Sequence, residues 1–188
     1  MKKIIILLLP LIYYSCQPIE KIEQVVFDNN QFSQFNILTD SIEIIEIFDK
    51  KISKPYIGHT LIVSPSQRIV NWVNDNFSAI GNENKFNVTI LDASLTQIQF
   101  ENKEAKNFDE KNHYKYELFY LVEFNLYDDF NNLIASTLVE TSRSTTSGAY
   151  ISIQEKEHII NDLVYLSLTD LSKESEKLIK KFMFDFII

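Results

Sequence analysis

The three histidines, His59, His113 and His158, are the first candidates for acid–base catalysis or metal binding. They lie in three separate segments, and none has the spacing of a metal-ligand motif such as H-E-x-x-H, which places two histidines on one helix face. His158 stands four residues before Asp162, but two isoleucines follow it, so the pair is most simply a surface contact on a helix. We therefore expect no metal and no cofactor at these positions.

Nucleophilic and carboxylate catalysis also lack a sequence signature. There is no G-x-S-x-G motif. Ser147-Gly148 resembles it only weakly and lies in an expected polar connector. The carboxylate pairs at 128–129, 155/157 and 174/176 fall in an expected turn or on an expected helix, whereas a glycosidase needs two carboxylates that converge across a cleft. We expect no catalytic residue, and therefore a protein that is not an enzyme.

Arg143 is one of only two arginines, and it closes an expected strand before a helix that begins with Glu155 and Glu157. The simplest interpretation is a salt bridge from the strand end to the first helical turn. The alternative is contact with a ligand or partner. The apolar tail "FMFDFII" is too short to span a membrane, so we expect it to pack on the sheet or on a partner. Arg143, Phe184 and Phe186 are thus the candidate interaction surface.

The N-terminus has the pattern of an export signal. Lys2 and Lys3 precede a nine-residue apolar segment, residues 4–12, that contains Pro10. At about 1.5 Å per residue this segment is too short to cross a hydrocarbon layer of about 30 Å, but it suits a signal peptide. The only cysteine, Cys16, follows directly after Ser15. We expect residues 1–15 to be the signal peptide.

The basic pair, the apolar run and Ser15-Cys16 resemble the lipobox of bacterial lipoproteins. The resemblance implies cleavage before Cys16, acyl chains such as palmitate on that residue, and a lipid anchor in the membrane. Tyr13 and Tyr14 depart from the pattern, which usually has Leu and then a small residue there. Gln17, in place of Asp, points to the periplasmic face of the outer membrane rather than the inner membrane. The alternative is a plain signal peptide with an incidental thiol.

Charge and composition exclude several classes of protein. The net charge is −8, and it becomes −10 when Lys2 and Lys3 leave with the signal peptide, so we expect no nucleic acid as a partner. Apolar residues make up 45% of the chain, which is enough for a real core and argues against disorder. One cysteine forms no internal disulfide, so the fold must depend on its core alone.

The expected elements follow from hydrophobic periodicity and capping signals. Seven even-numbered residues from Tyr114 to Leu126 are apolar or aromatic, which predicts one buried face of a strand. Ser64 and Ser152 begin capping boxes that predict helix starts, and Gly81 is the expected stop of the first helix. A bend or bulge is expected at residues 92–94. Strands are expected at 41–48, 85–100, 113–127 and 133–143, and helices at 65–80 and 153–183.

This β-α-β-β-β-α order predicts a single α+β domain at residues 41–188, with two helices packed on one face of a mainly antiparallel sheet. Residues 16–40 are polar and irregular and are expected to be a membrane tether, although three phenylalanines indicate partial docking. The segment "RSTTSGAY" is expected to be a loop between the last strand and the last helix.

The segments "RIVNWVNDNFSAIG", "ILDAS", "TSRS" and "SIQEKEHIINDLVYLSLTDLSKESEKLIKKF", over about residues 55–182, resemble uncharacterised small envelope lipoproteins of Gram-negative bacteria. The element order is also similar to auxiliary lipoproteins of ABC-type lipid transport systems and to the lipopolysaccharide-assembly lipoprotein that plugs an outer-membrane barrel. These likenesses imply an adaptor or accessory subunit of an envelope transport or assembly machine, with an envelope protein as partner. A carrier with an apolar lipid or small-ligand cavity between sheet and helices is the alternative, and an envelope hydrolase is a third.

Overall fold

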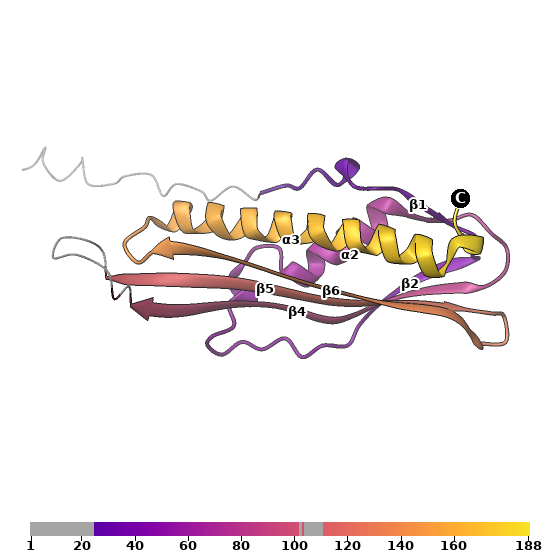
Figure 1. Cartoon of the computed structure of the whole chain (residues 1–188), viewed down its shortest axis with the longest axis horizontal. Helices are drawn as coiled ribbons and strands as arrows, with labels where there is room; N and C mark the ends of the chain where they lie inside the picture. The colour runs from indigo at the N-terminus through magenta and orange to yellow at the C-terminus, as the bar shows by residue number, and fades with distance from the viewer. Residues whose placement is uncertain (1–24, 102, 104–110) are drawn as a thin grey trace, which may run out of the picture.

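A four-stranded sheet forms the base of the fold. The computed structural model describes residues 25–101, 103 and 111–188. The strands lie in the order β2 (Ser41–Glu46), β4 (Lys85–Glu101), β5 (Asn112–Tyr127) and β6 (Leu133–Gly148). β4, β5 and β6 are antiparallel neighbours, whereas β2 pairs with β4 in parallel. Both helices lie on the same side of this sheet (Figure 1), which confirms the expected α+β class.

The alternation in β5 places its apolar face toward the helices. Each even-numbered residue from Tyr116 to Leu126 is buried, as expected. The register between β4 and β5 shifts between Ile90 and Asp92, next to the bend expected at residues 92–94. β6 continues to Gly148, so the prediction of a loop from residue 143 was wrong. Its backbone pairs with the start of β5, where His113 lies opposite Gly148, and this pairing keeps a polar segment extended.

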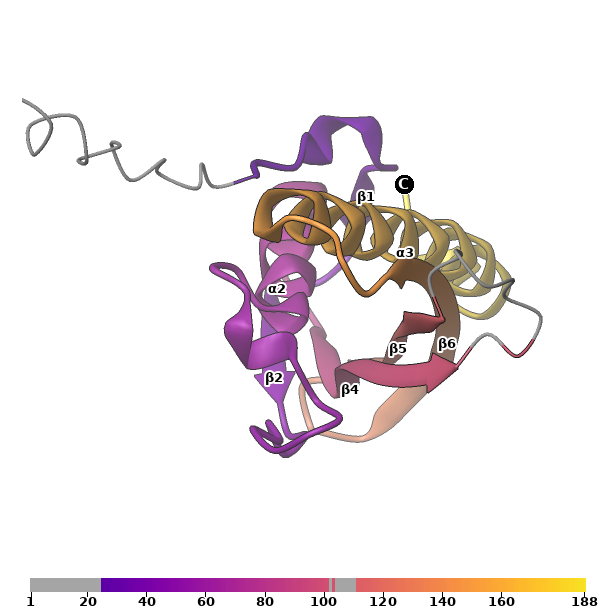
Figure 2. The same ribbon diagram turned by 90° about the vertical axis from the view of Figure 1, so that its left-hand side faces the viewer.

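Helix α3 (Ile153–Phe182) runs along the sheet and is roughly 45 Å long at 1.5 Å per residue. It begins where expected, because the Ser152 hydroxyl accepts a hydrogen bond of 3.1 Å from the backbone N–H of Glu155. Seen along the long axis, the sheet curls so that β6 rises beside α3 and β2 lies beside α2 (Figure 2). The helices therefore occupy the concave side.

Helix α2 (Pro65–Asn76) also begins as expected, with the Ser64 hydroxyl accepting from the N–H of Gln67 at 3.2 Å. It ends at Asn76, however, so the prediction that it continues to about residue 80 was wrong. The next three residues form β3 (Phe77–Ala79), which pairs in parallel with β1 (Phe35–Ile37). Phe77 leaves the helix because its ring stacks on Phe35 at 4.4 Å between centroids.

Gly81 was expected to end the first helix, but in the structure it lies where two backbone segments pass close together. A Cβ atom at this position would lie 2.7 Å from the backbone C of Leu38 and 2.7 Å from the backbone N of Thr39. Glycine is therefore the residue that lets two backbone segments approach this closely.

Residues 25–37, which we call the N-terminal strap, lie along α3 rather than apart from the domain (Figure 1). The Tyr165 hydroxyl donates to Gln31 at 3.1 Å, and the Ser33 hydroxyl donates to Glu176 at 2.5 Å. Farther along, Ile37 forms an antiparallel bridge with Ile187 near the C-terminus. The described part of the expected tether is thus docked on the domain, in the manner that its phenylalanines indicated.

Large side chains fill the space between the sheet and the helices. Five of the fully buried ones are aromatic residues of α2 and the central strands: Trp72, Phe86, Tyr116, Tyr120 and Phe124. Each contributes about 1.5–3 kcal/mol on burial, and together they occupy the region where a carrier would need its cavity. Within the described ranges, no helix has the length and apolar character needed to cross a membrane.

Candidate functional site

The residues predicted to form an interaction surface lie in two different places. Arg143 is on the edge strand β6, opposite Leu118, whereas Phe184 and Phe186 lie after the end of α3. Cys16, the expected lipidation site, lies outside the described residues. The structure therefore separates Arg143 from the two phenylalanines.

Arg143 forms an ion pair with the middle of α3. Its Nε and Nη2 donate to the two carboxylate oxygens of Asp170 at 2.8 and 3.1 Å, and these hydrogen bonds raise the pKa of Arg143. The prediction that Arg143 pairs with Glu155 or Glu157 was therefore wrong. β6 continues five residues beyond Arg143, about 17 Å, so the first turn of α3 lies well past this arginine, and Asp170, 17 residues after Ile153, is the acid beside it.

The tail after α3 has an exposed side and a packed side. Phe184 is 76% exposed, whereas Phe186 packs against the core and its carbonyl accepts a hydrogen bond from Leu38 N. Phe182 and Ile188 are also exposed, and the Lys181 ammonium lies 4.8 Å from the ring centroid of Phe182. We call Phe182, Phe184 and Ile188 the C-terminal tip.

A further exposed aromatic residue lies at the same end of the molecule. The turn between β5 and β6 lies at the same end of the molecule as the C-terminus (Figure 1), and Phe130 in this turn is 85% exposed. Its turn is held by Asp128, which accepts from the backbone N–H groups of Phe130 and Asn132 and has a lowered pKa as a result of its hydrogen bonds. Sequence reasoning interpreted this segment only as a turn, so Phe130 was missed.

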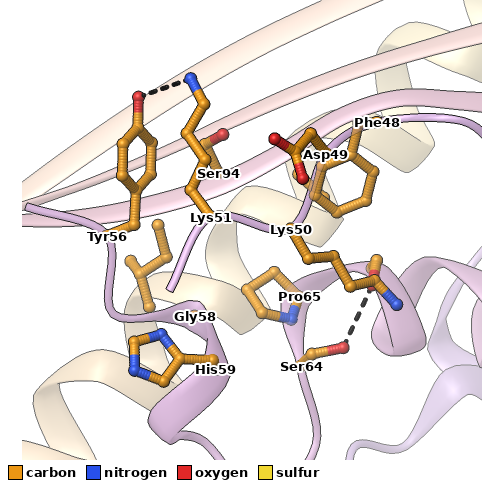
Figure 3. Close-up of a pocket in the computed structure, with 13 residues that line it drawn as sticks. Phe48, Asp49, Lys50, Lys51, Tyr56, Gly58, His59, Ser64, Pro65 and Ser94 are labelled. Atoms are coloured by element: carbon orange, nitrogen blue, oxygen red, sulfur yellow. Dashed lines mark hydrogen bonds between the residues drawn. The ribbon is translucent and has the colours of Figure 1, made fainter. Parts of the chain in front are cut away.

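A small pocket lies between the loop that precedes α2 and the bulged part of β4 (Figure 3). Its walls include Phe48, Pro65 and Leu95, and its volume is about 60 Å³. At the rim, Lys51 donates to the Tyr56 hydroxyl at 3.1 Å, which raises the pKa of Lys51. Ligand sites usually measure about 300–1,000 Å³, so this pocket admits one small group rather than a lipid.

The second arginine, Arg68, is buried under the N-terminal strap. Its Nη2 donates to the carbonyl of Val25 at 2.6 Å, and its guanidinium carbon lies 3.8 Å from the ring centroid of Phe27. Sequence reasoning did not single out Arg68, because it lies among the polar residues of an amphipathic helix. Only the docking of the strap, far away in sequence, buries it.

The histidines stay apart in three dimensions. His59 lies in the short helical turn before α2, His113 at the start of β5, and His158 near the start of α3. In the part of the chain that the structure describes, no group of three or more His, Cys, Asp or Glu residues has an arrangement that could hold a metal ion.

No family model matches this sequence, and no curated protein sequence matches it. Among solved structures, the chain is similar to a minor lipoprotein from Acinetobacter baumannii, with 10% identity and a TM-score of 0.42 over 78% of this chain and 96% of that one. It is also similar to rare lipoprotein B from Shewanella oneidensis, with 11% identity and a TM-score of 0.37 over 72% of this chain and 95% of that one. At these values the likeness carries no argument about function.

Proposed function

We propose that this protein is a lipid-anchored lipoprotein of the cell envelope, held at the periplasmic face of the outer membrane through Cys16. In this role it acts without catalysis, as an adaptor or accessory subunit of an envelope transport or assembly machine. The basic pair, short apolar run and Ser15-Cys16 at the N-terminus support the anchor.

The observation that carries the adaptor role is the position of the exposed aromatic side chains. Val25, where the described chain begins, lies beside Asn161 in the first third of α3, whereas the C-terminal tip lies beyond the other end of that helix. Asn161 and Phe182 are separated by roughly 31 Å at 1.5 Å per residue. The described strap thus begins far from the exposed Phe184 and Ile188, and this separation supports a contact surface at the end of the domain opposite Val25.

Exposed aromatic residues are typical of protein interfaces, because they contribute large contact areas at low conformational cost. The carrier alternative has less support, since side chains fill the region between sheet and helices. An envelope hydrolase would need Arg143 beside a histidine and carboxylates. Instead, this arginine is paired with Asp170.

A photo-crosslinking experiment in intact cells tests the adaptor role. A crosslinking amino acid replaces Phe184 in one strain and Ile153 in a matched control, because Ile153 is 73% exposed at the opposite end of α3. We expect one discrete crosslinked envelope protein from position 184 and none from position 153. Equal, diffuse or absent crosslinks from both positions would contradict the proposal.

Mass spectrometry of the purified membrane form tests the anchor separately. We expect a chain that begins at Cys16 and carries acyl chains. An unmodified chain with a free thiol would contradict the lipid anchor, without bearing on the crosslinking result.

A further inference from the structure

Arg68 is the only charged side chain among the buried residues of the described chain, with 6% of its surface exposed. It lies on the second turn of α2, below the N-terminal strap. Buried arginines are normally paired with a carboxylate, because an uncompensated buried charge is costly. The groups around Arg68 therefore show whether its buried charge is compensated.

No carboxylate compensates the charge of Arg68. The guanidinium has five N–H donors, of which Nη2 donates to the Val25 carbonyl, while the buried Nε has no acceptor. Among the described residues, none of the ion pairs includes Arg68. Burial accordingly lowers the pKa of Arg68, and only Tyr120 acts in the opposite direction. Glu157 lines a small pocket together with Arg68, and Asp75 lines the groove on its other side, but neither carboxylate forms an ion pair with it among the described residues.

A groove of about 360 Å³ opens beside Arg68, between the strap and α2. This volume lies within the range of small-molecule sites. Two apolar residues, Val26 and Phe27, line one part of the groove. The rest of the lining is polar: Asn29, Arg68, Asn71, Asn74 and Asp75. Asp75 is engaged by Asn29, whose amide donates to it at 2.7 Å. Asn71 Oδ1 accepts a hydrogen bond from Gln67, and its amide nitrogen donates to none of the described residues.

We propose that Arg68, with the amide of Asn71, binds a small oxyanion in this groove, namely the carboxylate or phosphate group of a small molecule or of a lipid headgroup. A planar guanidinium with unused donors matches two oxygens of such a group. The anion would supply the counter-charge that the described residues do not provide. This site is independent of the adaptor role, since it lies on α2 and the strap and not at the C-terminal tip.

Both sources of the oxyanion are within reach. A free metabolite can enter from the open side of the groove. The lipid source rests on the proposed anchor at Cys16: the eight residues 17–24 reach at most about 29 Å, which keeps a membrane headgroup within that range of Val25.

Isothermal titration calorimetry on the full-length protein in detergent, against a sodium chloride background of equal ionic strength, tests the site. The probes are sodium phosphate, sodium acetate and monomeric dihexanoyl phosphatidylglycerol. Arg68→Met removes the charge while keeping a long side chain. Arg68→Lys keeps the charge but lacks the planar guanidinium that donates to two oxygens at once. Arg143→Met is the matched control, because it removes the other arginine, which lies outside the groove.

We expect the unmodified protein and the Arg143→Met variant to bind at least one probe. Arg68→Met should weaken binding by tenfold or more, and Arg68→Lys by a smaller factor. Tighter binding of the phosphatidylglycerol than of phosphate would assign a lipid headgroup, and the reverse a free anion. The proposal is overturned if no probe binds, or if Arg68→Met binds as well as the unmodified protein. Binding that appears only after Glu20→Gln and Glu23→Gln would also overturn it, because the site would then belong to the chain's own carboxylates.

Discussion

Ile37 and Ile187 form an antiparallel bridge that joins the N-terminal strap to the C-terminal tail. Two backbone hydrogen bonds flank it, from Leu38 N to the Phe186 carbonyl at 2.8 Å and from Ile188 N to the Asn36 carbonyl at 3.0 Å. The two ends of the described chain therefore hold each other in place. The exposed C-terminal tip is consequently fixed in position, although Phe184 itself makes little contact.

Removal of residues 184–188 should destabilise the protein by about 1–3 kcal/mol, because it deletes the bridge and two hydrogen bonds worth about 0.5–1.5 kcal/mol each. Urea unfolding followed by circular dichroism measures this change. Phe184→Ser is the control, since an exposed side chain should change stability by less than about 0.5 kcal/mol. Equal losses in both variants would show that the tail does not act through its backbone.

Gly81→Ala should destabilise the fold by about 1–3 kcal/mol, because the new Cβ would lie 2.7 Å from backbone atoms of Leu38 and Thr39, which cannot move aside easily. Gly58→Ala is the matched control. There the nearest atom is the Cδ of Pro65 at 3.5 Å, an ordinary contact. Thermal unfolding compares the two variants. A larger loss for Gly58→Ala would contradict the close approach described here.

Ser64→Ala and Ser152→Ala should each cost about 1 kcal/mol, because each hydroxyl accepts a hydrogen bond from the first turn of its helix. Ser142→Ala, at an exposed position on β6, is the control for loss of a hydroxyl and should be nearly neutral. Urea midpoints at constant slope measure these differences. Neutral cap variants would mean that tertiary packing alone sets the helix starts.

Glu176 should make stability depend on acid pH. Hydrogen bonds from Lys180 and then from Ser33 lower its pKa below the usual value of 4.5. A carboxylate whose pKa is lowered in the folded state contributes stability above its unfolded pKa, and that contribution is lost as the pH falls through the folded value. Stability should therefore decrease as the pH falls below about 4.5.

Glu176→Gln should remove this part of the pH dependence and loosen the strap, which Ser33 attaches to Glu176. Because the carboxylate is about one-third exposed, solvent screening keeps the effect below about 1 kcal/mol. Urea unfolding at pH 7 and pH 3.5 measures it, with Glu140→Gln as a control for loss of an exposed negative charge. An unchanged pH profile in Glu176→Gln would contradict the assignment.

The long elements were predictable because their signals are local. A serine followed by a Gln or Glu three residues later specifies a helix start, and the strict alternation from Tyr114 to Leu126 specifies a strand face. Two elements were not predictable on that basis. β1 and β3 are three residues each and stabilise each other across more than forty positions, so neither has a periodic pattern of its own.

The candidate sites were predictable in part. The apolar tail was expected to pack on the sheet or on a partner, and the structure divides it: Phe186 packs inward beside the strap, whereas Phe184 is exposed. The partner of Arg143 was misjudged, since it depends on how far β6 extends before α3 turns back. No local sequence pattern indicated that Arg68 is buried, because the strap that covers it is distant in sequence.

The sequence by itself determined the two helix starts, the buried face of the central strand and the α+β class. These features rest on interactions between residues that are neighbours along the chain or share one periodic face. Tertiary structure decided where α2 ends, how the strap docks, which acid pairs with Arg143, and that Arg68 is buried without one. Those outcomes depend on contacts between distant segments, whose geometry is set only when the strap, the sheet and α3 pack together.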